Sequence, residues 1–426
     1  MTLTHSLEYA DHCDSTDPMG PFRSRFALPS DDSGLPLLYL CGHSLGLMPH
    51  AARGLLTEEL DDWARLGVRG HEEARRAWIY YLENLRTDLA ALVGAEAEEV
   101  VAMNSLTINL HLMLASFFRP RGRRTRIVIE SGAFSSDRHA VSSILELHGL
   151  DPQQHLIEIA PLPGEDLIHE DAIDGILTEQ GEDIALVLWP GIQFRTGQSF
   201  DLERIAESAR RAGAVVGFDL AHSIGNVPVS LRDSEPDFAV WCSYKYLNAG
   251  PGAIGGCFVH RRHFAAPLRP RLSGWWGHEV ATRFEMGPQF LAAHGASGFQ
   301  VSNQPILSAA PLAASLLIFR EAGLTRLRAK STALTGFLER LVERNSADVQ
   351  IVTPRTPASR GAQLSLRIRG GSDRGRRVFD WLAEHGAVGD WRAPDILRVA
   401  PVPLYNSFRD VFCFAERLNE ALRETP

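Results

Sequence analysis

Lys245 and Asp219 each follow a short apolar run, and a lysine and a carboxylate in such settings can do chemistry together. Lys245 lies between a strand-like run and a glycine-rich segment, in "FAVWCSYKYLNAGPGAIGG" (238–256). Asp219 ends another apolar run, in "VVGFDLAHS" (215–223). If both runs are parallel strands, both residues lie at the carboxyl edge of the sheet, where open α/β folds bind ligands.

Burial disfavours the ammonium form of a lysine, so Lys245 can supply the neutral amine of a Schiff base. Each residue alone has an ordinary alternative: a lysine that snorkels to solvent, an Asp219 that caps a helix, and a His222 that is a hydrogen-bonded core residue. Taken together they favour pyridoxal 5′-phosphate (PLP). Its aldehyde needs an amine, and its ring nitrogen needs an anionic partner.

Two further segments could bind the ends of a cofactor and a substrate. In "AMNSLTINLHL" (102–112) a strand end precedes a helix start, where the amides of Leu106 and Thr107 could bind a phosphate. Simple helix capping by Ser105 and Thr107 is compatible with this role. Arg398, in the strand-like "ILRVAP" (396–401), could grip an α-carboxylate with two hydrogen bonds, although a solvated strand arginine is the alternative.

The elements that must position these residues alternate between strands and helices. A helix between residues 201 and 213 is indicated by Asp201 as its cap, one apolar face, and Gly213 as its stop. This alternation predicts an α/β domain whose mainly parallel sheet is covered by helices on both faces. The predicted strands are 100–103, 126–130, 184–190, 214–219, 238–243 and 254–259.

The pattern changes near residue 305 and predicts a smaller α+β domain. A long helical pattern (305–323) leads to a strand (362–368), a helix around 376–386, a strand (396–401) and a final helix after Ser407. We expect residues 1–49 to pack with this small domain, 50–304 to form the large domain, and 305–426 to form the small one. Segments 19–37 and 353–361 are rich in proline, glycine and serine and are expected to be loops.

Composition excludes several kinds of partner. The 426 residues carry a formal net charge of −9 with acids and bases interspersed, which argues against nucleic acid or an anionic membrane as partner. The five cysteines show neither a disulfide framework nor paired metal spacing. The acidic N-terminus lacks the apolar core of a signal peptide, and no apolar run is long enough to span a bilayer. We therefore expect a cytoplasmic protein with a small-molecule substrate.

Six motifs in order along the chain resemble those of kynureninase, a PLP enzyme of the aspartate-aminotransferase fold (fold type I). They are "CGHSLGL" (41–47), "FDLAHSIGNV" (218–227), "CSYKYLNAGPG" (242–252), "GWWGHE" (274–279), "VSNQPI" (301–306) and "RVAPVPLYNSF" (398–408). The resemblance implies cleavage of the Cβ–Cγ bond of kynurenine or 3-hydroxykynurenine, which gives alanine and an anthranilate. It also implies a homodimer with shared active sites and no metal.

The resemblance further implies a role for each matching residue. Lys245 would be the Schiff-base lysine, Asp219 the partner of the pyridine nitrogen, and Tyr244 a proton relay. Other implied cofactor contacts are Leu106, Thr107, Phe134, Asp137, His222, Tyr244, Trp275 and Asn303. Implied substrate contacts are Ser44, His71, Trp275, Ser302, Asn303 and Arg398, some of them from the second subunit. The polar groups His71, Ser302 and Asn303 favour a ring-hydroxylated substrate.

Four positions differ from the family pattern. His43 replaces an asparagine, Pro190 a small polar residue, Arg195 an aromatic residue, and Trp276 a smaller phenylalanine. We expect these changes to lie on the substrate or phosphate side and to alter the accepted ring substituent. Arg195 is either an extra anchor near the phosphate or a surface residue.

Other functions remain open from the residues alone. An aminotransferase would also use Lys245 and Asp219, but it has no use for residues that surround an aryl ketone. A cysteine desulfurase needs a mobile reactive cysteine, whereas Cys413 lies in an apolar helical pattern and looks buried. A non-catalytic PLP-binding protein is the third alternative.

Overall fold

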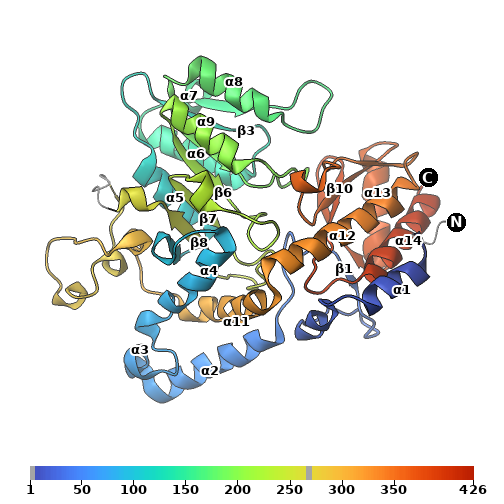
Figure 1. The fold of residues 1–426 in the computed structure, drawn as a ribbon, viewed down its shortest axis with the longest axis horizontal. Helices are drawn as coiled ribbons and strands as arrows, with labels where there is room; N and C mark the ends of the chain where they lie inside the picture. Colours follow the sequence, from blue (N-terminus) through green and yellow to red (C-terminus); the bar gives the residue numbers. More distant parts are fainter. Residues whose placement is uncertain (1–4, 265–270) are drawn as a thin grey trace.

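A seven-stranded sheet forms the centre of the large domain (Figure 1). The computed structural model describes residues 5–264 and 271–426. The strand order is β2-β8-β7-β6-β5-β3-β4, in which β8 runs antiparallel to both neighbours and the other pairs are parallel. The strands are β2 (Val100–Ala102), β3 (Arg126–Glu130), β4 (Leu156–Ile159), β5 (Ile184–Pro190), β6 (Val215–Asp219), β7 (Phe238–Trp241) and β8 (Gly256–Val259).

The predicted mainly parallel sheet is confirmed, and β4 is the one strand of this sheet that the sequence pattern missed. Most of β4 is only partly buried because it lies at the edge of the sheet, next to β3 alone. Its residues therefore lack the continuous apolar character of the central strands. The helix predicted from Asp201 is also confirmed, since Asp201 accepts a hydrogen bond from the Arg204 amide at 3.1 Å and Gly213 ends the helix with φ +74°.

Helices cover both faces of this sheet and give it two apolar cores. In β3, Val128 faces one core while Ile127 and Ile129 face the other, because successive side chains of a strand point to opposite sides. The helices of this part are α2 (His50–Leu66), α3 (Gly70–Glu73), α4 (Arg86–Val93), α5 (Leu106–Phe117), α6 (Ser135–Leu147), α7 (Pro152–His155), α8 (Glu170–Gln180), α9 (Leu202–Ala212), α10 (Leu231–Ser234) and α11 (Ile306–Ala322).

The small domain is built on a four-stranded antiparallel sheet of order β12-β13-β10-β9. The N-terminal segment lies beside it: β1 (Leu38–Tyr39) pairs with β11, and Asp14 of α1 (Leu7–Ser15) accepts a hydrogen bond from the Phe408 amide at 2.7 Å. Figure 1 shows α1 beside the C-terminal helix α14. The remaining elements are α12 (Leu324–Glu343), β9 (Val349–Ile351), β10 (Leu364–Ile368), α13 (Ser372–Glu384), β11 (Ala387–Val388), β12 (Asp390–Arg392), β13 (Ile396–Val399) and α14 (Phe408–Glu424).

The two domains meet along the long helical pair α11 and α12. Leu312 and Leu316 of α11 belong to a core of the large sheet, whereas Leu334 and Phe337 of α12 belong to the core of the small domain. The predicted boundaries at residues 50 and 305 stay predictions.

Among the described residues no single helix is long and apolar enough to cross a membrane. Only α11 and α12 together, bent by 84°, reach that length and composition.

Candidate active site

A cavity of about 130 Å³ opens at the carboxyl ends of the parallel strands. Glu130, Pro190 and Asp219 are the last residues of β3, β5 and β6, and all three line it. Lys245 follows β7 at the same edge and lines the cavity as well. The edge predicted from the sequence is therefore the edge at which Lys245 and Asp219 meet.

Lys245 is held by a histidine and lies beside two aromatic rings. Its Nζ is 3.0 Å from Nε2 of His222, and the ring centroids of Phe134 and Tyr244 lie 5.8 and 5.9 Å from Nζ. Burial, followed by the positive charges of Lys245 and Arg398, lowers the pKa of His222 well below its usual value. His222 is therefore a neutral acceptor for Lys245, and burial raises the pKa of Tyr244, which keeps its phenol protonated.

Three carboxyl groups share the floor of the cavity. Asp219 accepts a hydrogen bond from the Ala221 amide at 2.7 Å, and Asp137 hydrogen-bonds to Asp219. Burial raises the pKa of all three, and the charge of Asp219 adds to the rise at Asp137 and Glu130. Lys245 and the hydrogen bond from Asp137 act in the opposite direction on Asp219. The balance of these effects favours the charged form at Asp219 and the protonated form at Asp137 and Glu130.

The N-terminus of α5 forms another wall of the cavity. Leu106 and Thr107, the first residues of this twelve-residue helix, line the cavity, and Ser105 makes no side-chain cap hydrogen bond to the helix. Ser136, at the start of α6, lies on the same cavity. Unpaired helix amides and two hydroxyls form a suitable setting for an anion such as phosphate.

Arg398 lies in β13, almost fully buried, and reaches from the small domain toward the cavity. Its Nη1 donates to the carbonyl of Phe194, a cavity residue, at 2.7 Å, and its Nε donates to Asp390 at 3.0 Å. The ring of Phe194 in turn packs edge-on against Phe134, with centroids 5.3 Å apart. Arg398 and the wall of the cavity are therefore fixed to each other.

Besides Arg398, which touches the cavity wall through Phe194, five of the expected contact residues do not line the cavity of their own chain. Ser44 lies close to it, because Gly46 two residues later donates to the carbonyl of Tyr244 at 2.8 Å. The other four lie elsewhere: Trp275, Ser302 and Asn303 belong to the segment between β8 and α11, and His71 to α3, with its ring packed against Trp78. Figure 1 shows this part of the chain at the edge of the large domain far from the small one.

The four residues that differ from the family pattern have four different settings. Pro190 lines the cavity, and His43 is fully buried close to Arg398. Trp276 is buried under the guanidinium of Arg283. Arg195 is not an anchor of the cavity: its Nη2 forms an ion pair with Asp395 of the small domain at 2.6 Å.

Sequence reasoning missed Glu130, Ser136, Ile192 and Phe194, all of which line the cavity. Glu130 could have been found, because a carboxylate that ends an apolar strand is the same signal that identified Asp219. Phe194 follows β5 in a segment without regular structure, and its position depends on contacts with the small domain. The residues around Phe194 in the sequence do not predict contacts with a distant domain.

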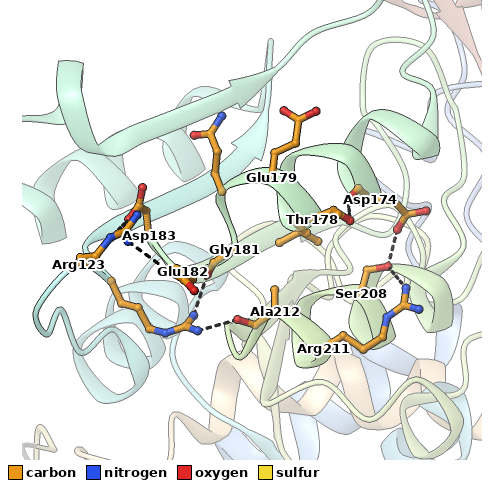
Figure 2. Close-up of a pocket in the computed structure, with 13 residues that line it drawn as sticks. Arg123, Asp174, Thr178, Glu179, Gly181, Glu182, Asp183, Ser208, Arg211 and Ala212 are labelled. Carbon is orange, nitrogen blue, oxygen red and sulfur yellow. Dashed lines mark hydrogen bonds and ion pairs between the residues drawn. The ribbon is translucent and has the colours of Figure 1, made fainter.

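A second, larger cavity lies at the opposite edge of the same sheet. It is lined by residues that precede β3, β5 and β6, among them Arg123, Asp183 and Ala212. Figure 2 shows that its charged groups pair with one another: Arg123 with Glu182 and Asp183, and Arg211 with Ser208, which donates to Asp174. Arg123, Glu182, Asp183 and Asp174 therefore have partners at this edge, whereas one carboxyl oxygen of Glu130 at the other edge is buried without a partner among the described residues.

The groups around the smaller cavity fit PLP. An amine, a buried carboxylate, helix amides and the ring of Phe134, which is 40% exposed, face one space. One carboxyl oxygen of Glu130 and Nδ1 of His222 are buried there without a partner among the described residues. Fold and site together define a PLP enzyme of fold type I.

Comparisons with known proteins identify the family within that class. The chain is 54% identical to a kynureninase of Xanthomonas campestris pv. campestris (strain B100), over 98% of each chain. It is 53% identical to a kynureninase of Xanthomonas euvesicatoria pv. vesicatoria (strain 85-10), over 98% of this chain and 99% of that one. Residues 327–418 match the model of the kynureninase C-terminal domain. The chain belongs to the kynureninase family.

Solved structures agree on the fold. The cysteine desulfurase CsdA of Escherichia coli superposes with a TM-score of 0.76 over 96% of this chain and 99% of its own, at 18% identity. A C-DES variant with glycine covalently linked to its PLP cofactor superposes with a TM-score of 0.75 over 90% of this chain and 96% of its own, also at 18% identity.

Cys413, expected to be buried, is only partly buried on α14, and burial raises the pKa of its thiol.

Proposed function

We propose that this chain cleaves 3-hydroxykynurenine, or a kynurenine with another ring substituent, to L-alanine and the matching anthranilate. Kynurenine cleavage with PLP is the activity of the family to which the chain belongs. The observation that supports it most directly is the convergence of Lys245 and Asp219 on one cavity, with Arg398 fixed beside it.

We assign the cofactor contacts as follows. Lys245 would bind the aldehyde of PLP, and Asp219 would pair with the protonated ring nitrogen. The amides of Leu106 and Thr107 would receive the phosphate, and Phe134 would lie against the ring. PLP, when bound, supplies an electron sink for the charge that is left when a bond to Cα of the amino acid breaks.

The side chains of the cavity would direct the protons. The free Nζ of Lys245 would take the proton from Cα of the substrate, and neutral His222 is placed 3.0 Å away to accept a hydrogen bond from it. The protonated phenol of Tyr244 can donate to Cβ when the Cβ–Cγ bond breaks. One water is consumed at the aryl ketone, whose oxygen needs hydrogen-bond donors as charge develops on it.

The donors for the ketone and ring would come from a second copy of the chain. His71, Trp275, Ser302 and Asn303 do not line the cavity of their own chain, so we propose a homodimer in which they complete the partner's site. An apolar cavity of about 770 Å³ beside the Lys245 loop supports this arrangement. It is lined by residues that include Leu45, Met48, Pro251 and Leu307.

The first test is kcat/KM for kynurenine, 3-hydroxykynurenine and a ring-methylated 3-hydroxykynurenine, with alanine and the anthranilate measured together. We expect a preference for a hydroxylated substrate, and equal values for all three would contradict the proposed role of His71 and Asn303. Transamination without alanine release would point to an aminotransferase. Unchanged substrates in the presence of bound PLP would point to a non-catalytic protein.

Mixing two inactive variants tests the shared site. If Lys245→Ala and Asn303→Ala subunits exchange at random, half the dimers are mixed and each mixed dimer has one intact site. About a quarter of the wild-type activity should return. No recovery despite subunit exchange, measured by sedimentation of tagged chains, would place Asn303 in its own chain's site.

The cytoplasmic location stays a prediction.

A further inference from the structure

Arg398 is held so that part of its guanidinium remains available. Nε donates to Asp390 at 3.0 Å, Nη2 lies 2.8 Å from the second oxygen of Asp390, and Nη1 donates to the Phe194 carbonyl at 2.7 Å. A guanidinium has five N–H donors, so donors on Nη1 and Nη2 are left for a ligand. Asp390 also pairs with Arg392 at 2.9 Å, which leaves one net positive charge on the three groups.

His43 lies against this group and has no hydrogen-bond partner. Its ring nitrogens are buried and unpartnered within the described part of the chain, and the side chain is fully buried. A nitrogen of His43, the sulfur of Cys41 and an oxygen of Asp390 lie within 4.8 Å of one another. Burial, then the charges of Arg398, Arg392 and Lys245, lowers the pKa of His43 well below its usual value, so the imidazole is neutral.

Cys41, His43 and Asp390 are poorly suited to bind a metal ion together. The carboxylate of Asp390 is already held by two guanidiniums, whose positive charges repel a metal ion. Burial raises the pKa of the Cys41 thiol to about 12, so no thiolate is present to attract a cation near neutral pH. The net positive charge favours an anion.

We propose that His43 is a further contact for the amino acid carboxylate, an uncharged donor beside Arg398. A neutral imidazole has one N–H, and a carboxylate bound to the unused donors of Arg398 would give this buried donor the partner it lacks. This inference rests on the proposed function, because the ligand is the α-carboxylate of the same substrate. His43 would then make the site more selective for a carboxylate over an uncharged group of similar size.

The test compares L-alanine with L-alaninamide, which lacks the carboxylate charge. Each is titrated into the PLP-loaded enzyme, and the change in cofactor absorbance gives its Kd. We expect His43→Leu to weaken L-alanine binding roughly 10- to 150-fold, the effect of one hydrogen bond to a charged group, and to leave L-alaninamide nearly unchanged. His43→Asn, which keeps a donor, should stay within about threefold of wild type.

Matched variants keep the result interpretable. Cys41→Ala removes the neighbouring thiol and should leave the ratio of the two Kd values unchanged. If His43→Leu does not fold, His43→Phe keeps a ring and removes the donor, with the same expected result. Equal weakening of both ligands, or no weakening of L-alanine, would overturn the role of His43. Absence of kynurenine cleavage with a normal alanine-to-alaninamide ratio would instead reject only the proposed function.

Discussion

The two edges of the large sheet both carry charged residues, but these residues are paired at one edge and buried with shifted pKa values at the other. At the amino ends of β3, β5 and β6, arginines and carboxylates pair with each other around an open groove (Figure 2). At the carboxyl ends of the same strands, Glu130, Asp137 and Asp219 are buried with raised pKa values, beside a single lysine. Charged groups with satisfied partners stabilise a fold, whereas buried groups with perturbed pKa values are typical of a catalytic site.

Replacement of Lys245 should cause the largest loss of activity. If it does not, the carboxyl edge of the sheet does not differ from the amino edge in function. We expect Lys245→Ala to abolish both the absorbance of the enzyme-bound cofactor and turnover, because no other amine among the described residues lines the cavity. Absorbance spectra and alanine release measure the two losses. The matched control is Arg123→Ala at the opposite edge, where both should persist. Retention of turnover in Lys245→Ala would remove the central claim.

The next largest effect is expected at the buried arginine. Arg398→Ala should weaken substrate binding by roughly 2–5 kcal/mol, because it removes a buried charge from the carboxylate site. Steady-state kinetics should show this mainly as a raised KM. Arg398→Lys should recover only part of the loss, since an ammonium lacks the planar pair of donors. An unchanged KM in Arg398→Ala would refute the role.

At the amino edge we expect a loss of stability without a loss of activity. Arg124 donates to the carbonyls of Gly181, Ile184 and Ala212 at 2.8–2.9 Å, so Arg124→Ala should lower the free energy of unfolding by about 1–3 kcal/mol. Arg123, whose side chain is 72% exposed, should contribute at most about 1 kcal/mol. Denaturant unfolding measures both, and a fall in kcat/KM for the folded Arg124 variant would contradict the division between the edges.

A more gradual effect is expected from a change in pH. The pKa values of His43 and His222 are lowered in the folded protein, so their stabilising contribution is present above the ordinary histidine pKa of about 6.5 and is lost as pH falls below it. The free energy of unfolding of the cofactor-free protein should fall by up to about 1.4 kcal/mol per pH unit for each histidine.

Replacing one of these histidines sharpens that measurement. His43→Asn should make the slope shallower below about pH 6.5 and leave it unchanged above. Unfolding by urea at several pH values gives the slope for both proteins. The same slope in both would mean that His43 does not stay neutral in the folded protein, and Arg398, Arg392, Lys245 and Asp390 are the charged groups around it that could be responsible.

Much of the site could be predicted because strand ends carry it. Asp219 and Lys245 follow apolar runs, and parallel strands bring their carboxyl ends to one edge whatever the details of packing. Glu130 obeys the same rule, since it is the last residue of the apolar strand β3, and the same reasoning would place it at this edge. Arg195, in contrast, was placed near the phosphate as one of two possibilities, and it pairs with Asp395, a residue of the other domain.

The sequence by itself determined the class of fold and the edge of the sheet at which Lys245 and Asp219 meet, because these follow from local periodicity and chain direction. Only the tertiary structure decided which groups surround them. The contacts of Phe194 with Arg398, the three shared carboxyls and the unpartnered ring of His43 join segments far apart in the chain. Their protonation states depend on burial, which no short stretch of sequence specifies.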